Sequence, residues 1–156
     1  MAEAAVVESA PEQRQEGDPY LGVFVGAEMY GLPLHRLREV SRLNGLRRIA
    51  GAPSHVAGMV NLRGEIICVL DGRAILGLPA APSYGPGPGY VIALRDFDFP
   101  VGLVVDWITD IFTVEKSAIE LPPLDWSVER RACVVGAATI GVDAIGLLDL
   151  DRVVNR

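Results

Sequence analysis

Two stretches of this 156-residue chain, one near the middle and one at its end, close in the same way. Each passes through apolar residues to an aspartate and then into a short segment: Val69-Leu-Asp-Gly-Arg-Ala-Ile-Leu76 and Leu147-Leu-Asp-Leu-Asp-Arg-Val-Val154. An aspartate that follows a strand can cap a short helix, because its carboxylate accepts hydrogen bonds from free backbone N–H groups. The repetition predicts two similar small β-barrels packed together, and a chance likeness of two apolar strands is the alternative.

A hairpin led by an aromatic residue also opens each half of the chain. Tyr20 to Leu34 has the pattern of two strands joined at Gly26 to Glu28. Tyr90 to Leu94 and Val101 to Val105 have the same pattern, and Trp107 to Val114 is predicted to continue the second hairpin as an alternating strand. These strands predict a mainly β fold with short helices.

The first nineteen residues contain too few apolar side chains to offset the entropy cost of ordering, so they are predicted to be a disordered acidic tail. The folded domain is expected over residues 20–156, with a first barrel at about 20–80 and a second at about 90–150. Between them, residues 79–89 are predicted to be a loop. Its Gly85-Pro-Gly-Pro-Gly89 is no phosphate cradle, because proline lacks the N–H donor that a cradle needs.

Two shorter segments are also predicted, the first of them with two alternatives. Apolar residues recur every third position from Leu34 to Leu43, which fits a short helix and an extended segment equally well. Gly72 to Leu78 is predicted to be a short helix that ends at Gly77 and Pro79.

The segment from Gly58 to Asp71 combines a small-residue turn, one arginine and a short apolar run. Ile66 to Leu70 is too short for a buried helix and rich in β-branched residues, which predicts a strand buried on both faces. Arg63 then lies at the mouth of this strand, where its planar guanidinium can bind a carboxylate or backbone oxygen of a partner. An internal salt bridge to an acidic residue such as Glu39 is the alternative, and the two roles can coexist.

The net charge of −6 is unevenly distributed. Residues 1–19 hold five acidic residues and one basic residue, residues 20–78 hold four and seven, and residues 90–156 hold eleven and six. Nucleic-acid binding is not expected of an acidic chain, because phosphate contacts need a basic surface. No apolar run approaches the roughly 20 residues that cross a bilayer, and no secretory signal is visible, so we expect a cytoplasmic protein without membrane insertion.

Residues with catalytic patterns are scarce. His35 and His55 have no sequence neighbour that suggests an activated nucleophile. Cys68 and Cys133 lie in apolar runs without metal-ligand spacing, so buried free thiols are expected, and a disulfide between them is the alternative. The pattern favours a binding module without catalytic residues, metal or cofactor. The rival is a small β-barrel enzyme or ligand-binding protein with a site between the two halves.

With these residues in view, the chain resembles the CheW family of bacterial chemotaxis coupling proteins over residues 20–154. Four pieces in order carry the resemblance: Phe24-x-x-x-x-x-Tyr30-Gly31 with Leu37-Arg-Glu-Val40 after it, Ala52-Pro53 leading to Gly58-Met-Val-Asn-Leu-Arg-Gly64, Val101-Gly-Leu-Val-Val-Asp106, and Leu147-Leu-Asp149. The Asn-Leu-Arg-Gly piece before an apolar strand is the most specific. The chain departs from the family at Cys68 and Gly72, where the family commonly has a proline and a leucine.

The resemblance implies two intertwined five-stranded SH3-like β-barrels. It also implies a non-catalytic adaptor that joins the cytoplasmic helical tip of a chemoreceptor (methyl-accepting chemotaxis protein) to the regulatory domain of a CheA-type histidine kinase, in receptor arrays at the inner face of the membrane. The partner-binding residues carried over by motif are Leu37, Arg38, Glu39, Arg63 and Val91. The kinase-facing surface is expected on the first barrel. The departures leave a regulator of a nonflagellar chemosensory pathway, for twitching, gliding or development, as the alternative.

Overall fold

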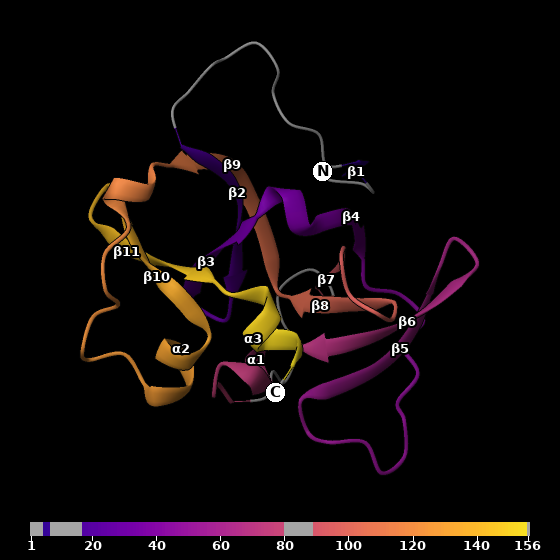
Figure 1. Cartoon of the computed structure of the whole chain (residues 1–156). Helices are drawn as coiled ribbons and strands as arrows, with labels where there is room; N and C mark the ends of the chain where they lie inside the picture. The colour runs from indigo at the N-terminus through magenta and orange to yellow at the C-terminus, as the bar shows by residue number, and fades with distance from the viewer. Residues whose placement is uncertain (1–4, 7–16, 80–88, 156) are drawn as a thin grey trace.

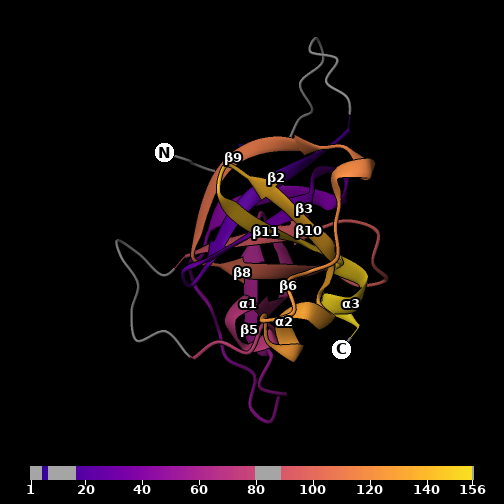
Figure 2. The ribbon, with the colours of Figure 1, turned by 90° about the vertical axis from the view of Figure 1, so that its left-hand side faces the viewer.

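A computed structural model describes residues 5–6, 17–79 and 89–155 of the chain. Two β-sheets lie side by side in it (Figure 1). Turning the molecule brings the second sheet to the front, and both views place α1, α2 and α3 together on one side of the molecule (Figure 2). Among the described residues, no helix has the length and apolarity that a bilayer span requires.

The strands of the described residues form a six-stranded and a five-stranded sheet. The first sheet has the order β1-β4-β7-β8-β6-β5 and consists of β1 (Ala5–Val6), β4 (Leu37–Arg42), β5 (Val56–Leu62), β6 (Glu65–Asp71), β7 (Tyr90–Leu94) and β8 (Val101–Val105). The second has the order β10-β11-β3-β2-β9 and consists of β2 (Asp18–Val25), β3 (Glu28–Pro33), β9 (Trp107–Val114), β10 (Val134–Ile140) and β11 (Asp143–Leu148). The short helices are η1 (Leu34–Arg36), α1 (Gly72–Ile75), η2 (Lys116–Ala118), α2 (Val128–Ala132) and α3 (Leu150–Val154).

The two halves of the chain exchange their opening hairpins. The hairpin β7–β8 of the second half lies between β4 and β6 of the first, and β8 runs parallel to β6. The hairpin β2–β3 of the first half lies between β9 and β11 of the second, and β3 runs parallel to β11. The predicted fold of two intertwined barrels is thereby confirmed.

The two sheets do not correspond to the two parts of the sequence that residues 79–89 separate. Each sheet takes strands from both sides of that boundary, because the gap between its outer strands is filled by the other half's hairpin. The strand predicted at residues 107–114 is present as β9, but it pairs with β2 and not with the hairpin that it follows in sequence.

Each barrel is closed by an isolated β-bridge beyond its edge strand. In the first barrel, Arg47 and Met59 exchange backbone hydrogen bonds of 2.9 and 2.8 Å. In the second barrel, Glu120 and Ala137 exchange two of 2.8 Å. The first bridge joins the chain after β4 to β5 and the second joins the chain after β9 to β10, so the two halves use the same closure.

A glycine precedes the bridged residue in both closures. A Cβ added to Gly58 would collide with the carbonyl oxygen of Arg47, and a Cβ added to Gly136 would lie 2.7 Å from that of Glu120. The strand register also shifts immediately before each glycine. A bulge followed by glycine thus lets the two backbones approach closely enough to bridge.

Buried side chains form one shared core and two smaller ones. The shared core draws on both sheets and on α1 and α3, and Tyr30, Leu103 and Leu150 are among its members. A second group, around Ile67, lies within the first sheet, and a third, around Leu147, lies within the second. Because the largest core needs both sheets, the two barrels form one packing unit.

Several local predictions can be compared with the structure. Asp71 accepts hydrogen bonds from the N–H groups of Arg73 and Ala74, and Asp149 accepts one from that of Arg152, so both aspartates cap short helices as predicted. The strand expected at residues 66–70 is present, but it is not buried on both faces. Its Ile66 is 55% exposed, because none of the described elements covers the outward face of the β5–β6 hairpin.

The predicted disordered tail lies mostly outside the described residues, as do residues 80–88 of the predicted loop. Of the first nineteen residues, Ala5–Val6 form β1 on the edge of β4, and Asp18 and Pro19 begin β2. In Figure 1 β1 lies beside β4.

Candidate functional site

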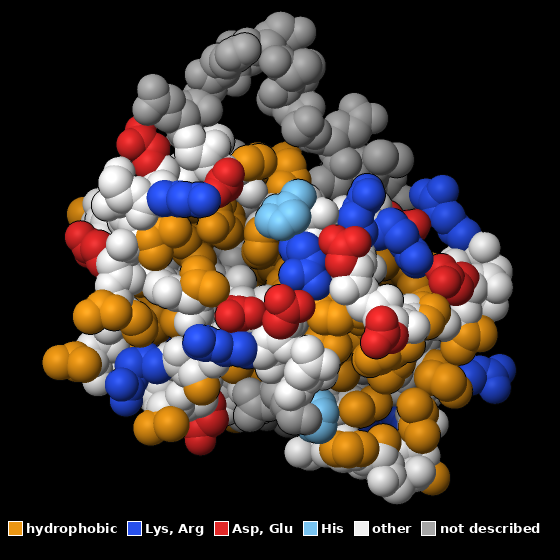
Figure 3. All heavy atoms as spheres, in the orientation of Figure 1, with side chains coloured by type: hydrophobic (Ala, Val, Ile, Leu, Met, Phe, Trp, Pro, Cys, Tyr) orange, Lys and Arg blue, Asp and Glu red, His pale blue; other side chains and the backbone are white. Residues whose placement is uncertain are grey.

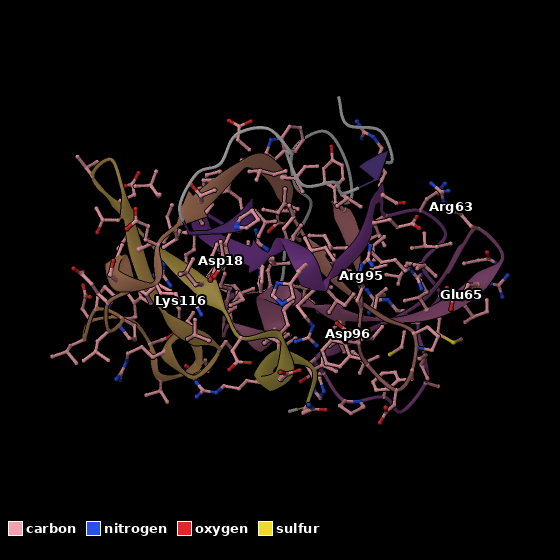
Figure 4. The ribbon with its side chains drawn as sticks, turned by 45° about the horizontal axis from the view of Figure 1, so that its top comes forward. Asp18, Arg63, Glu65, Arg95, Asp96 and Lys116 are labelled. Carbon is pink, nitrogen blue, oxygen red and sulfur yellow. The ribbon has the colours of Figure 1, made fainter. Side chains whose placement is uncertain are left out.

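The charged residues predicted to contact partners lie where β4 meets the turn between β5 and β6. Arg38 and Glu39 lie on β4, and Arg63 lies in the turn. Figure 4 shows Arg63 and Glu65 at the tip of the β5–β6 hairpin, at the edge of the molecule. β4 and the β5–β6 hairpin lie near opposite ends of the first sheet, and closure of the barrel brings them together.

Arg63 occupies the first position of a tight two-residue turn. Leu62 pairs with Glu65 across the hairpin, which leaves Arg63 and Gly64 as the loop. Their φ angles are 52° and 86°, the pattern of a type I′ turn, and the Asn61 Oδ1 accepts a hydrogen bond of 2.9 Å from the Gly64 N–H. A side chain at positive φ costs on the order of 1 kcal/mol, so the fold holds an arginine in an unfavourable conformation at an exposed tip.

Two ion pairs connect β4 to this turn. The Arg63 Nε lies 3.2 Å from the Glu39 Oε2, and the Arg38 Nη2 lies 2.9 Å from the Glu65 Oε1. The internal salt bridge raised as an alternative is therefore present. It coexists with exposure, because the Arg63 side chain is 65% exposed while that of Glu39 is 14% exposed. Water around the Arg63 guanidinium screens the pair, so its contribution to stability is on the order of 1 kcal/mol.

Arg38 is the extra residue of a β-bulge. Leu37 pairs with Leu94 and Glu39 pairs with Ala93, so Arg38 has no partner opposite it on β7. A bulge redirects side chains that strict alternation would place on opposite faces. It allows Arg38 and Glu39 to reach the outer surface together, on the side of the β5–β6 turn.

Leu37 and Val91 do not reach the surface. Leu37 is 1% exposed and belongs to the shared core, and Val91 is fully buried inside the first barrel. The structure thus brings together three of the five predicted contact residues at the surface and places the other two behind them. The motif gave their position in the strand but not the face to which each side chain points.

An open hollow of about 400 Å³ adjoins the Arg38–Glu65 pair. Its other wall is the end of β7 at Leu94 and the β7–β8 loop, residues 95–100, in which the Arg95 Nε donates a 2.8 Å hydrogen bond to the Leu37 carbonyl oxygen. Figure 4 shows Arg95 and Asp96 on this side of the barrel. The hollow mixes both signs of charge with phenylalanine and proline, which suits a protein contact better than an enclosed ligand.

Cys68 and Cys133 are not joined in a disulfide, and Cys133 is buried while Cys68 is half-buried. Burial raises the pKa of the Cys68 thiol, so it is protonated at neutral pH. Within the described parts of the chain, no three His, Cys, Asp or Glu side chains are grouped closely enough to hold a metal ion.

Asp106 is a structural residue whose role sequence reasoning missed. Its carboxylate accepts a hydrogen bond from the Gly26 N–H in the β2–β3 turn, and its Oδ2 lies 3.1 Å from the Arg73 Nε of α1. Asp106 comes directly after β8, so it joins the end of one exchanged hairpin to the turn of the other. Nothing in the sequence could show this, because the two hairpins are 80 residues apart.

Sequence analysis did not name the exposed apolar residues on the outside of the first barrel. Met59, Ile66 and Phe99 are all more than one-third exposed. Met59 pairs with Cys68 across the hairpin, Ile66 is two residues before Cys68, and the Cys68 N–H donates to the Pro100 carbonyl oxygen beside Phe99. Met59 and Ile66 therefore lie close together on the β5–β6 hairpin, and Phe99 lies in the loop that adjoins β6; these three exposed residues are here called the outer apolar face. Figure 3 shows hydrophobic side chains gathered on the lower right of the molecule and mixed charges above them.

Comparison with known proteins finds a matching family and several related proteins. The CheW-like domain family matches residues 19–156. The chemotaxis protein CheW of Rhizobium meliloti is 32% identical over 130 residues, which cover 83% of this chain and 82% of that protein. CheW of Klebsiella aerogenes is 26% identical over 139 residues, which cover 89% of this chain and 82% of that protein.

A solved structure shares the fold. The scaffolding protein TtCheW from Thermoanaerobacter tengcongensis matches with a TM-score of 0.74 and 24% sequence identity, over 85% of this chain and 89% of that one. Because the family match spans nearly the whole chain and the solved relative has the same fold, this chain belongs to the CheW-like family.

Proposed function

We propose that this chain is a non-catalytic adaptor that couples the cytoplasmic tip of a chemoreceptor to the regulatory domain of a CheA-type histidine kinase, on the cytoplasmic side of receptor arrays. Family membership supports the proposal, since its relatives are chemotaxis proteins and its structural neighbour is a scaffolding protein. The single observation that carries it is Arg63, a mostly exposed cation fixed in a strained turn.

The receptor-facing surface in this proposal consists of Arg38, Glu39 and Arg63. A receptor tip is helical and offers carboxylates and backbone oxygens, which a planar guanidinium binds with defined geometry. The ion pair with Glu39 limits the positions that the guanidinium adopts, so less entropy is lost when the receptor binds.

The kinase-facing surface in this proposal is the outer apolar face of Met59, Ile66 and Phe99. Exposed apolar residues that adjoin one another on the outside of a barrel lose contact with water when a partner covers them. The charged residues around the hollow beside Arg38 then form a polar rim, as in many transient protein interfaces.

The test is to separate the two contacts by substitution. Arg63→Ala should weaken binding of a receptor-tip fragment about tenfold or more and leave binding of the kinase regulatory domain unchanged. Ile66→Asp should do the reverse, because it places a charge in the middle of an apolar contact. Val135→Asp is the matched control, since Val135 is 53% exposed on β10 of the other sheet.

Isothermal titration calorimetry with each purified partner measures both affinities. Absence of any complex with either partner at high micromolar concentration would sink the adaptor proposal. Loss of both affinities in either variant would show that the two surfaces are assigned wrongly.

A further inference from the structure

Arg36 lies behind the hollow and contacts the loop that forms one of its walls. The Arg36 side chain is only 15% exposed, and its guanidinium reaches two elements that are far apart in sequence. On one side it meets the β7–β8 loop, and on the other it meets Asp151 of α3. In the view of Figure 4, Asp96 of the loop lies between α3, in yellow, and Glu65.

The shape of the β7–β8 loop is not determined by strand pairing. Ala93 and Gly102 form the last register pair of the hairpin, and residues 95–100 lie beyond it. Asp96 has a φ of 67°, a left-handed conformation that residues other than glycine adopt at a cost. A long hairpin loop with such a residue keeps one shape only where contacts outside the hairpin hold it.

Contacts with the residues at the start of β4 supply part of this hold. The Arg95 N–H donates a 2.7 Å hydrogen bond to the Arg36 carbonyl oxygen, and the Arg95 Nε donates one to that of Leu37. In return, the Arg36 Nε and Nη2 both lie 3.4 Å from the Arg95 carbonyl oxygen, and the Arg36 Nε lies 3.6 Å from the Asp96 Oδ2. The Arg36 guanidinium also covers the Phe97 ring, 4.7 Å from its centroid. One side chain thus contacts three consecutive loop residues.

The other side of the guanidinium is fixed by α3. The Arg36 Nη1 and Nη2 donate hydrogen bonds of 3.5 and 3.1 Å to the two carboxylate oxygens of Asp151, a two-point contact that orients an arginine well. α3 is packed against the shared core, because its Leu150 and Val153 are buried. Arg36 therefore connects the loop to a helix that the core holds in place.

The loop carries Phe99, one of the three residues of the outer apolar face. Phe99 is 47% exposed and lines the hollow, which Arg36 does not. Its neighbour Pro100 accepts a 3.2 Å hydrogen bond from the Cys68 N–H of β6. The loop is thus attached to β6 at one end and to Arg36 at the other, with Phe99 between the two attachments. A contact residue held in this way loses less conformational freedom when a partner covers it.

We propose that Arg36 is a positioning residue for the kinase contact. With Asp151 as its anchor, it holds the β7–β8 loop in the shape that presents Phe99, and it does not touch the kinase itself. The hold on the loop does not depend on the proposed function, whereas the effect on kinase binding rests on it.

The test replaces Arg36 by Gln in the full chain, which removes the guanidinium and its charge. Asp151→Asn is the second variant, because it removes the charge of the anchor at a side chain that is 65% exposed and leaves Arg36 in place. Arg152→Gln is the matched control, since this arginine of the same helix donates to the Val134 carbonyl oxygen of the second sheet.

Two measurements separate the parts of the proposal. The heteronuclear NOE of the amides of residues 95–99, measured by NMR, reports motion of the loop. Isothermal titration calorimetry with the kinase regulatory domain reports the contact.

In Arg36→Gln we expect lower NOE values at residues 96–99 and about fivefold weaker kinase binding. Asp151→Asn should show the same changes to a smaller extent, and the control should show neither. Arg36→Gln combined with Phe99→Ala should bind within about twofold of Phe99→Ala alone, because Arg36 acts through Phe99. A general loss of stability does not produce this lack of additivity.

Unchanged NOE values in both variants overturn the hold on the loop. A more mobile loop with unchanged kinase affinity overturns the role in the contact, and additive losses in the double variant overturn the action through Phe99. If Arg36→Gln does not fold, Asp151→Asn decides both parts. If the adaptor proposal itself is wrong, the unsubstituted chain does not bind the kinase domain, while the NOE values still test the hold on the loop.

Discussion

At the scale of single residues, the site depends on backbone conformation as much as on side-chain chemistry. Type I′ turns favour Asn-Gly, and this chain has Arg-Gly at the β5–β6 turn. The arginine thus occupies a position where asparagine is the better residue for folding. A residue that is worse for stability at an exposed tip is what the proposed contact with a partner would require.

This conflict yields a prediction for Arg63→Asn. The free energy of unfolding should change by less than about 1 kcal/mol, because asparagine suits the turn while the loss of Arg63 leaves the mostly buried Glu39 carboxylate without its ion-pair partner. Receptor binding should nevertheless fall about tenfold. Urea denaturation and calorimetry measure the two quantities, and a clear loss of stability would show that the salt bridge is the main role of Arg63.

Arg63→Glu should behave differently. It places a carboxylate beside Glu39, whose side chain is only 14% exposed, so like charges repel in a partly buried site. We expect a loss of about 1 kcal/mol or more in unfolding free energy along with weaker receptor binding. Equal stability of the Asn and Glu variants in urea would contradict the geometry described for Glu39.

The helix caps permit a matched pair of tests. Asp71→Ala and Asp149→Ala should each lower the free energy of unfolding by about 1 kcal/mol, because each removes an acceptor from the start of a short helix. Asp71→Asn and Asp149→Asn keep an acceptor and should lose much less. Thermal unfolding of the four variants distinguishes capping from a general effect of charge.

Sequence patterns predicted where the candidate site residues lie along the chain better than the directions of their side chains. The position of Arg63 at the mouth of a strand followed from local sequence, and its pairing with Glu39 was one of two roles left open. The burial of Leu37 and the outward turn of both Arg38 and Glu39 did not, because they depend on a one-residue bulge against β7. The same bulge, with the 3-10 turn before it, explains why apolar residues recur every third position from Leu34 to Leu43 without choosing a helix or a strand.

At the scale of elements, the isolated bridges that close the barrels are the most constrained features. Each depends on one glycine at which no side chain fits. The hairpins themselves were predictable, because alternation and turn residues are local signals. The partner of each strand was not, since the closing and parallel pairings join segments distant in sequence.

Gly136→Ala tests the closure of the second barrel. The new methyl group would meet the Glu120 carbonyl oxygen and the Ile119 side chain, so we expect a loss of about 1 to 3 kcal/mol in unfolding free energy. Gly141→Ala is the control, because its φ is positive but the space around it is open. Faster hydrogen exchange at Ala137 in the first variant would locate the damage at the bridge; an equal or smaller loss than in the control would contradict the role of the closure.

At the scale of the whole molecule, the exchange of hairpins makes each barrel depend on both halves of the chain. Asp106 reinforces this dependence, because it connects the β2–β3 turn to α1 and to the end of β8. We therefore expect fragments 1–82 and 83–156 to be unfolded when separate, since each lacks the hairpin that fills its sheet.

Mixing the two fragments should restore a folded complex. Two-dimensional NMR spectra of each fragment and of the mixture provide the measurement, with the intact chain as the reference. A well-dispersed spectrum from fragment 1–82 alone would mean that the first-half strands can form a barrel without the exchanged hairpin.

The exchange also has a consequence for the covalent connection between the halves. The angle between the barrels is set by the strand pairings and the shared core, so the length of the connection at residues 80–88 does not determine it. Evolution can lengthen or shorten this connection without changing the spacing of partners bound to the adaptor. For the same reason, it is the natural place to insert a fluorescent domain for following the protein in living cells.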